Sequence, residues 1–236
     1  DIEKIPLEDD YDILAFISKY SRNLEHWEKD IINIVREESM YFMPQAMTKI
    51  MNEGWASFWH YKIMSELDLP QEFHLSFLKF HNQVLRPMVG RINPYHLGFT
   101  IFKWIEKNKG LEECFIARTS HNDESFIRTY LNKEICEELN LFSYSKKKKE
   151  WTIDDISDND GWKQIREDLI KNVGLSSLPN IYVKELQKDH TLVLAHEHDG
   201  RDLDLDYAHN VCDHLLDLWG DDFKFFTIIE EEPFEI

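Results

Sequence analysis

Residues 49–60, Lys-Ile-Met-Asn-Glu-Gly-Trp-Ala-Ser-Phe-Trp-His, are the stretch that decides how the helical part of this chain is interpreted. Glu53 and His60 are seven residues apart, which is two helical turns, so both side chains project from one face. Lys49 lies one turn before Glu53. Burying a carboxylate among large aromatic side chains is costly unless a cation, a metal ion or hydrogen bonds compensate it. The stretch therefore predicts a long helix that carries a candidate functional site.

Gly54 lies in the interior of the same predicted helix. Glycine there costs about 1 kcal/mol relative to alanine, so we expect another backbone or a ligand to approach closely at this position. The neighbouring Trp55 and Trp59 are expected to be core residues, and truncating either should be strongly destabilising.

A carboxylate and an imidazole on one helical face can act as metal ligands, as an acid–base pair or as a salt-bridged structural pair. Spacing alone favours the structural role, because buried charges are normally paired. A zinc site needs three or four ligands, so Glu53 and His60 would need help from elsewhere, with Glu37, Glu38 or His81 as candidates. Glu53 and His60 are the two candidate metal ligands, and no catalytic residue is assigned.

Two further pairs of histidines are candidate metal ligands. His74 and His81 are seven apart on another predicted helix, where such a pair is more often a core or surface pair than a ligand set. His196 and His198 point to the same face of a predicted strand, and the acids that follow them could complete a metal site. Turn chemistry where the strand leads into a helix is the preferred interpretation, with Asp204 as the helix cap.

The composition limits the class of protein. The 236 residues are 42% hydrophobic and 13% aromatic, which is enough to bury a sizeable core. Lysine and arginine total 27 against 45 acidic residues, so the net charge of −18 repels polyanions. Nucleic acid is therefore excluded as a general partner, and a protein partner is expected.

The chain is expected to work in the cytoplasm. Its three cysteines contain no Cys-x-x-Cys pair, so neither a disulfide framework nor a cysteine zinc site is indicated. No apolar run approaches the ~20 residues of a membrane span, and the first residues given do not show the basic-then-apolar pattern of a signal peptide. Because the chain begins with Asp1 rather than methionine, we expect it to be part of a longer polypeptide.

The first 140 residues are expected to form a helical domain. After an acidic lead-in at 1–10, apolar residues recur at helical spacing in six segments, 11–20, 24–41, 44–67, 72–85, 95–108 and 124–139. Pro44 suits the first turn of the third helix, and Asn93 caps the fifth. Asn122 or Asp123 can cap the last one.

Residues 141–236 are expected to form a small α+β domain. Near-alternating apolar residues predict a hairpin over 141–156 with the lysines at 146–149 as its solvated tip. The remaining segments predict a helix at 158–172, strands at 180–186 and 190–196, a helix at 204–219 and a strand at 222–229. From residue 151 the order is β-α-β-β-α-β, which is the ferredoxin-like arrangement. The predicted class is therefore α+β, with a domain boundary near residue 140.

Familiar catalytic signatures are missing from the sequence. It contains no Gly-x-Ser-x-Gly, no phosphate-binding Gly-x4-Gly-Lys-Ser/Thr, no Gly-x-Gly-x-x-Gly and no His-Glu-x-x-His. The sequence therefore does not indicate an ordinary hydrolase or nucleotide enzyme.

Several long segments together resemble the stage V sporulation protein R (SpoVR) family, in its carboxy-terminal half. The resemblance spans nearly the whole chain and rests on unusual motifs within residues 35–60, 92–99, 123–131, 160–166 and 196–203, among them Asn-Glu-Gly-Trp-Ala, Ile-Asn-Pro-Tyr-His-Leu-Gly-Phe and His-Glu-His-Asp-Gly-Arg-Asp-Leu. It implies a cytoplasmic bacterial protein associated with formation of the spore cortex, without an established reaction.

The resemblance also bears on the metal question. Family members are about twice this length, and their other half carries a His-x-x-x-His-Asn-Asp-like segment. Followed by Asn-Glu-Gly-Trp-Ala, it is similar to the ligand order of gluzincin metalloproteases, in which Glu53 would be the third zinc ligand. The family pattern lacks the glutamate general base of those enzymes, which puts proteolysis in doubt.

Two hypotheses follow from the sequence. The first is a protein that acts through interaction, in which Lys49 or an arginine neutralises Glu53. The second is a zincin-like, degenerate metal-dependent hydrolase that would hold zinc only in the full-length protein, with Glu53 as a ligand.

Overall fold

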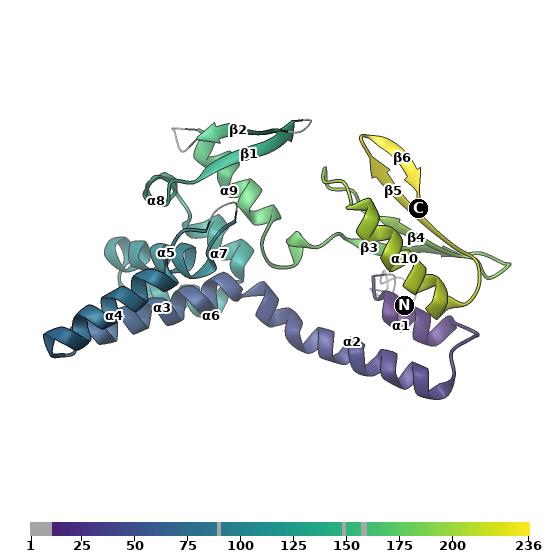
Figure 1. Cartoon of the computed structure of the whole chain (residues 1–236), viewed down its shortest axis with the longest axis horizontal. Helices are drawn as coiled ribbons and strands as arrows, with labels where there is room; N and C mark the ends of the chain where they lie inside the picture. The colour runs from purple at the N-terminus through teal and green to yellow at the C-terminus, as the bar shows by residue number, and fades with distance from the viewer. Residues whose placement is uncertain (1–10, 89–90, 148–149, 157–159) are drawn as a thin grey trace, which may run out of the picture. The chain divides into compact units, whose positions relative to one another are not determined.

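The computed structural model describes residues 11–88, 91–147, 150–156 and 160–236 (Figure 1). The acidic lead-in at 1–10, two lysines of the expected hairpin tip at 148–149 and the expected helix start at Asp158 lie outside these residues. The chain divides into two compact units: unit 1 comprises 1–42 with 178–236, and unit 2 comprises 43–177.

Unit 2 is mainly helical. Its elements are the end of α2 (His26–Met47), α3 (Lys49–Glu66), α4 (Gln71–Val84), α5 (Pro94–Lys109), α6 (Leu111–Ser120), α7 (Asp123–Tyr130), α8 (Lys133–Glu138), the strands β1 (Phe142–Lys147) and β2 (Glu150–Ile156), α9 (Gly161–Lys171) and a 3-10 turn, Gly174–Ser177. The buried core combines Phe58 of α3, Phe102 of α5 and Phe126 of α7 with Ile165 and Leu169 of α9.

Three details of the helical prediction are wrong. Pro44 does not open the third helix; it lies inside α2, where it removes one hydrogen bond of the helix, and α3 begins at Lys49. The segment expected as one helix over 124–139 is two helices, because Asn132 caps α8 through its side chain. Helix α6, which starts directly after Gly110, is absent from the six predicted helices.

Unit 1 contains one four-stranded sheet and its helices (Figure 1). Its elements are α1 (Ile13–Tyr20), α2 up to residue 42, β3 (Ile181–Leu186), β4 (Leu192–His196), α10 (Leu205–Trp219), β5 (Phe223–Ile229) and β6 (Glu232–Glu235). The strand order is β3-β4-β5-β6. Strands β4 and β5 are parallel and joined through α10, whereas the other two pairs are antiparallel. Helices and sheet together confirm the α+β class.

The ferredoxin-like arrangement is not confirmed. It requires all four strands in one sheet, but β2 pairs with β1 in a separate two-stranded sheet. In the four-stranded sheet β5 pairs directly with β4, and β6, absent from the prediction, forms the far edge. The boundary expected near residue 140 falls within unit 2, because α9 packs into the helical core there. The division into domains at 1–140 and 141–236 stays a prediction.

The core of unit 1 lies between α1, α10 and the sheet. Ile17 of α1 and Trp219 of α10 are fully buried with Leu192 and Phe225 of the strands. The Ser21 hydroxyl lies 3.1 Å from the carbonyl oxygens of Leu218 and Trp219, so the segment after α1 satisfies carbonyls at the end of α10. Among the described residues no helix is both long and apolar enough to cross a membrane.

Candidate functional site

The helices α3 and α5 cross with their backbones in direct contact. A Cβ added to Gly54 would lie 2.4 Å from the backbone of Gly98, and one added to Gly98 would lie 2.3 Å from the carbonyl oxygen of Ile50. Both glycines are buried. The prediction that another backbone approaches Gly54 is confirmed, and the approaching backbone is that of Gly98.

Glu53 immediately precedes Gly54 at this crossing, and its carboxylate interacts with Tyr95 of α5. Hydrogen bonding of the Tyr95 hydroxyl to Glu53 raises the pKa of Tyr95, and burial of Tyr95 adds to the rise. Glu53 is half-buried, and no ion pair in the described part of the chain includes it. Lys49 is exposed. Among the described residues, no ion pair joins Glu53 to Lys49 or to an arginine, so its neutralisation by one of them stays a prediction.

Asp123 fixes the start of α3 from a distant part of the sequence. Its carboxylate accepts hydrogen bonds from the backbone N–H groups of Ile50 and Met51, at 2.8 and 2.9 Å. The residue is only 1% exposed, and this burial raises its pKa to about 6, although the backbone hydrogen bonds oppose the rise. Asp123 thus satisfies free N–H groups in the first turn of α3.

The cap of α7 is the neighbouring residue. Asn122 accepts a hydrogen bond from the backbone N–H of Ser125, whose hydroxyl accepts one in return from the Asn122 backbone. Of the two caps that the sequence allowed for this helix, the structure uses Asn122, which leaves Asp123 for α3.

Asn93 holds the start of α5, as predicted, and also the end of α4. Its side-chain oxygen accepts from the Tyr95 N–H, while its amide donates to the carbonyls of Val84 and Arg86 at 2.7 and 2.9 Å. Several residues of the 92–99 motif therefore hold α5 in place, since Tyr95 interacts with Glu53 and Gly98 contacts Gly54. Three of the segments that carry the family resemblance meet at this crossing.

His60 does not share the contact that Glu53 makes. It is exposed, and its ring lies edge-on against Phe77 of α4 with 5.3 Å between centroids. His81 of α4 is 5% exposed and packs on Phe77, Tyr61 and Phe99, so it is a core histidine. Burial lowers its pKa, and the positive charges of His60 and Lys103 lower it further.

Glu37 and Glu38, two of the further ligands proposed for zinc, are both exposed on α2, and Arg36 pairs with Asp12 at 2.5 Å. Within the described ranges no group of three or more histidine, cysteine, aspartate or glutamate side chains could hold a metal ion. These residues do not by themselves fit a zinc site, and the assignment of Glu53 and His60 as metal ligands stays a prediction.

The tryptophans of α3 pack against the core, as expected. Trp55 makes edge contacts with Trp59, Phe102 and Phe115, with ring centroids 5.2 to 5.6 Å apart. Both tryptophans are partly buried. The Trp59 Nε1 is buried and is the one such side-chain polar atom without a hydrogen-bond partner in the described structure.

The His196–His198 segment lies where the parallel strands β4 and β5 end. His196 is 9% exposed, and its Nδ1 lies 3.0 Å from the Thr227 hydroxyl. Burial lowers the pKa of His196, with a smaller contribution from His198. In His198, Nδ1 accepts from the Gly200 N–H, and Nε2 lies 3.1 Å from Asp202. Both nitrogens of His198 are thus engaged within the loop, as turn chemistry predicts.

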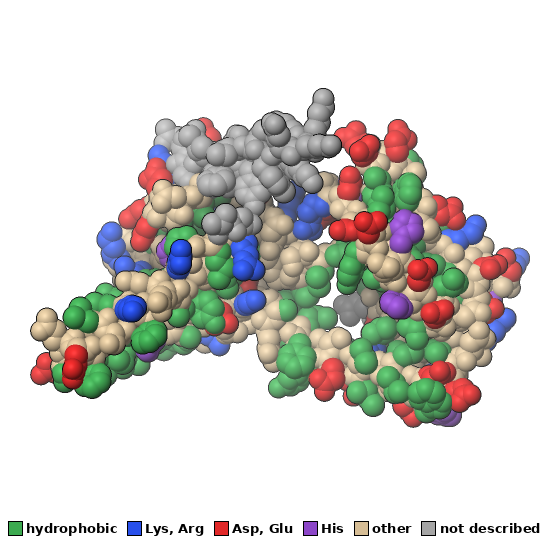
Figure 2. Space-filling view, in the orientation of Figure 1, with side chains coloured by type: hydrophobic (Ala, Val, Ile, Leu, Met, Phe, Trp, Pro, Cys, Tyr) green, Lys and Arg blue, Asp and Glu red, His purple; other side chains and the backbone are tan. Residues whose placement is uncertain are grey.

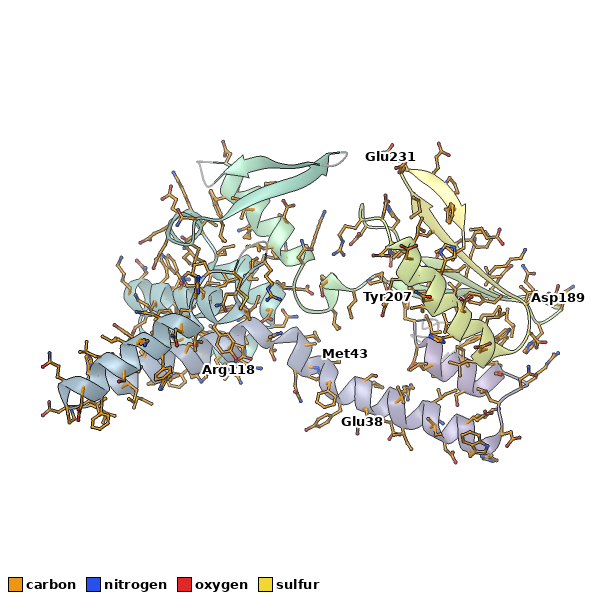
Figure 3. The ribbon with its side chains drawn as sticks, viewed as in Figure 1. Glu38, Met43, Arg118, Asp189, Tyr207 and Glu231 are labelled. Carbon is orange, nitrogen blue, oxygen red and sulfur yellow. The ribbon has the colours of Figure 1, made fainter. Side chains whose placement is uncertain are left out.

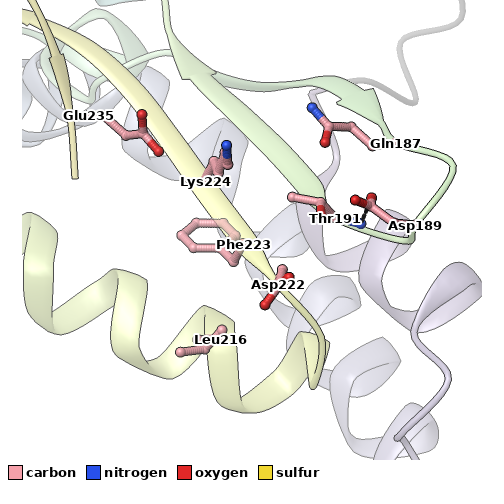
Figure 4. Close-up of a pocket in the computed structure, with 8 residues that line it drawn as sticks. All are labelled: Gln187, Asp189, Thr191, Leu216, Asp222, Phe223, Lys224 and Glu235. Atoms are coloured by element: carbon pink, nitrogen blue, oxygen red, sulfur yellow. Dashed lines mark hydrogen bonds between the residues drawn. The ribbon is translucent and has the colours of Figure 1, made fainter.

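A pocket of about 480 Å³ lies at the opposite end of these two strands (Figure 4). It is lined by Gln187, Asp189, Thr191, Leu216, Asp222, Phe223, Lys224 and Glu235. In open sheets of this kind ligands bind outside the carboxyl ends of parallel strands, whereas Thr191 and Asp222 precede β4 and β5. The position of the pocket does not favour it as the functional site.

Sequence reasoning missed two residues of the crossing. Tyr95 was not predicted as the partner of Glu53, because the spacing of residues within one helix does not indicate which residue of another helix they contact. Asp123 was assigned to its own helix, since capping signals are read within a few residues and its bonds to α3 span 72 and 73 positions.

Comparison with known proteins supports the resemblance. A family model described as SpoVR like protein matches residues 1–178, and one described as SpoVR-like C-terminal domain matches residues 179–228. The match is thus not confined to a carboxy-terminal half of the family. The uncharacterised protein YcgB of Escherichia coli (strain K12) is 32% identical over 253 aligned positions, which cover 93% of this chain and 49% of YcgB. The chain spans about half the length of that relative. No solved structure matches it.

Proposed function

Because the chain belongs to the SpoVR family, we propose that it acts in the cytoplasm in formation of the spore cortex, by binding another protein rather than by catalysing a reaction. What supports this is the number of large apolar side chains that the α3–α4 helix pair leaves exposed. Large exposed apolar patches mark interaction sites more often than chance.

The α3–α4 surface comprises Ile63, Leu67, Phe73, Phe80 and Val84, which are between 46% and 65% exposed. Phe73, Phe80 and Val84 recur at steps of seven and four residues, so they share one side of α4. Their neighbour Phe77 is buried and packs on Tyr61 of α3, which anchors α4 to α3, and on His81 of its own helix, while the others remain exposed. The α3–α4 surface therefore offers aromatic anchors on a helix that its own core holds in place.

The experiment replaces the SpoVR-family gene of a spore-forming bacterium with variants of the full-length protein. Phe73→Glu combined with Phe80→Glu places two charges on the α3–α4 surface, and we expect thin cortex in electron micrographs and fewer heat-resistant spores at unchanged protein level. Gln83→Glu, at an exposed position of the same helix, is the matched control and should sporulate normally. Normal cortex in the double variant would reject the proposal.

A second candidate, a metal-dependent hydrolase, is favoured by one observation. Glu53 is a half-buried carboxylate whose partner is a phenol and not a cation, so its charge is available to a metal ion. Two donors do not make a zinc site, and the remaining ligands would have to come from outside this chain. Metal analysis of the full-length protein tests this: stoichiometric zinc that is lost in Glu53→Ala supports it, and zinc absent from the wild type rejects it.

A further inference from the structure

Helix α2 carries an exposed apolar stripe within unit 1. We define the α2 stripe as Trp27, Ile31, Ile34, Val35, Tyr41 and Phe42, which are between 49% and 69% exposed. Their spacings of three, four and seven residues place them on one side of the helix. Hydrophobic side chains gather over α2 in Figure 2.

The opposite side of α2 packs against the rest of unit 1. Ile32 is 7% exposed and belongs to the unit 1 core. Arg36 pairs with Asp12 at 2.5 Å, and the Lys29 ammonium lies 3.4 Å from the carbonyl oxygen of Ser21. Lys29 and Arg36 are the lysine and arginine of this helix, so both of these positive charges are directed away from the stripe.

The charges beside the stripe are all acidic. Asp30 and Glu37 are seven residues apart along one edge, and Glu38 lies within the stripe, four residues after Ile34. All three are exposed (Glu38 is labelled in Figure 3), and none forms an ion pair in the described structure. A second copy of this helix would bring the same acids against them, and such like-charge contacts are unfavourable.

We propose that the α2 stripe binds an amphipathic helix of a separate protein, whose apolar face is flanked by lysine or arginine. Apolar anchors at steps of three, four and seven residues are the pattern by which helices recognise one another in grooves and pairs. Basic flanks would pair with Asp30, Glu37 and Glu38 and would set the orientation of the partner. The α2 stripe is distinct from the α3–α4 surface. The proposal also specifies the chemical character of the partner, which the proposed function leaves open.

The probe is a synthetic peptide of three heptads with leucine at the a and d positions and lysine at the flanking e and g positions. A matched peptide carries glutamate at e and g. We expect the lysine peptide, and not the glutamate peptide, to bind the full chain in fluorescence anisotropy at physiological salt. Ile31→Ala with Ile34→Ala should weaken binding at least about tenfold, since buried anchors dominate such interfaces.

Charge reversal separates a specific site from general attraction to an acidic chain. Glu37→Lys combined with Glu38→Lys should lower the affinity for the lysine peptide and allow the glutamate peptide to bind. The controls are Asp217→Lys, an exposed acid on α10, and Leu178→Ala, an apolar side chain that is 60% exposed; both should leave affinity within about twofold. Circular dichroism checks that each variant is folded.

Three results would overturn the proposal. They are the absence of lysine-peptide binding, equal weakening by Asp217→Lys and by the Glu37/Glu38 reversal, and self-association through the stripe in sedimentation experiments. The α3–α4 variants Phe73→Glu and Phe80→Glu should not change peptide affinity. The peptide measurement and the sporulation experiment can therefore fail independently.

Discussion

Replacing Gly98 with alanine tests the crossing of α3 and α5. The new Cβ would lie 2.3 Å from the Ile50 carbonyl oxygen, whereas ordinary van der Waals contact begins at 3.4 Å. The helices would therefore have to separate by about 1 Å, because the obstructing atoms are backbone and no rotamer change can move them. That separation also pulls Tyr95 away from Glu53.

The expected magnitude combines two opposing terms. Overpacking a core costs about 1–3 kcal/mol and occasionally more, and a backbone clash lies at the upper end. Alanine recovers about 1 kcal/mol through its better helix propensity. We expect Gly98→Ala to lower the free energy of unfolding of unit 2 by about 2 kcal/mol. Gly54→Ala should act similarly, and the double variant should cost less than the sum, because one separation relieves both clashes.

Urea unfolding followed by circular dichroism measures the change, and hydrogen exchange at the amides of α3 and α5 assigns it to unit 2. Ser65→Ala, at an exposed position of α3, is the matched control and should shift stability by less than about 0.5 kcal/mol. An unchanged or higher urea midpoint for Gly98→Ala would refute the close backbone contact.

Three further predictions concern the residues around this crossing. The pKa of Asp123 is raised from 3.8 to about 6. Protonation of this carboxyl therefore stabilises the folded state; the gain is complete below pH 3.8 and is lost as the pH rises through 6. At ~1.36 kcal/mol per pKa unit, the gain in the free energy of unfolding is at most about 3 kcal/mol. Urea midpoints at pH 4 and pH 7 should therefore differ more in the wild type than in Asp123→Asn, and equal differences would contradict the burial. Asn93→Ala should cost about 2–3 kcal/mol in the same assay, because it leaves two carbonyls and one N–H without their partner; a loss under 0.5 kcal/mol would show that water replaces the side chain. Glu53→Gln should lower the pKa of Tyr95 toward its ordinary value near 10 in a tyrosine NMR titration, and an unshifted titration would mean that the hydroxyl does not bond to Glu53.

Much of the helical architecture could be read from local sequence. The caps Asn93 and Asp204 and the helices that they begin follow from capping signals and apolar spacing within a few residues. Gly54 predicted a close backbone approach for the same reason, since an interior glycine has a local cost that something must offset. The sequence likewise implied the family resemblance and the acidic character that disfavours polyanionic partners.

Only the tertiary structure decided which residues meet. Tyr95 reaches Glu53, Asp123 reaches the start of α3, and β5 pairs with β4 while β2 pairs elsewhere. These choices depend on packing between segments far apart in the chain, where side-chain fit and burial decide between pairings that have equal local propensity. Periodicity fixes which residues share the face of one helix, but the opposing partner is fixed only when the core is assembled.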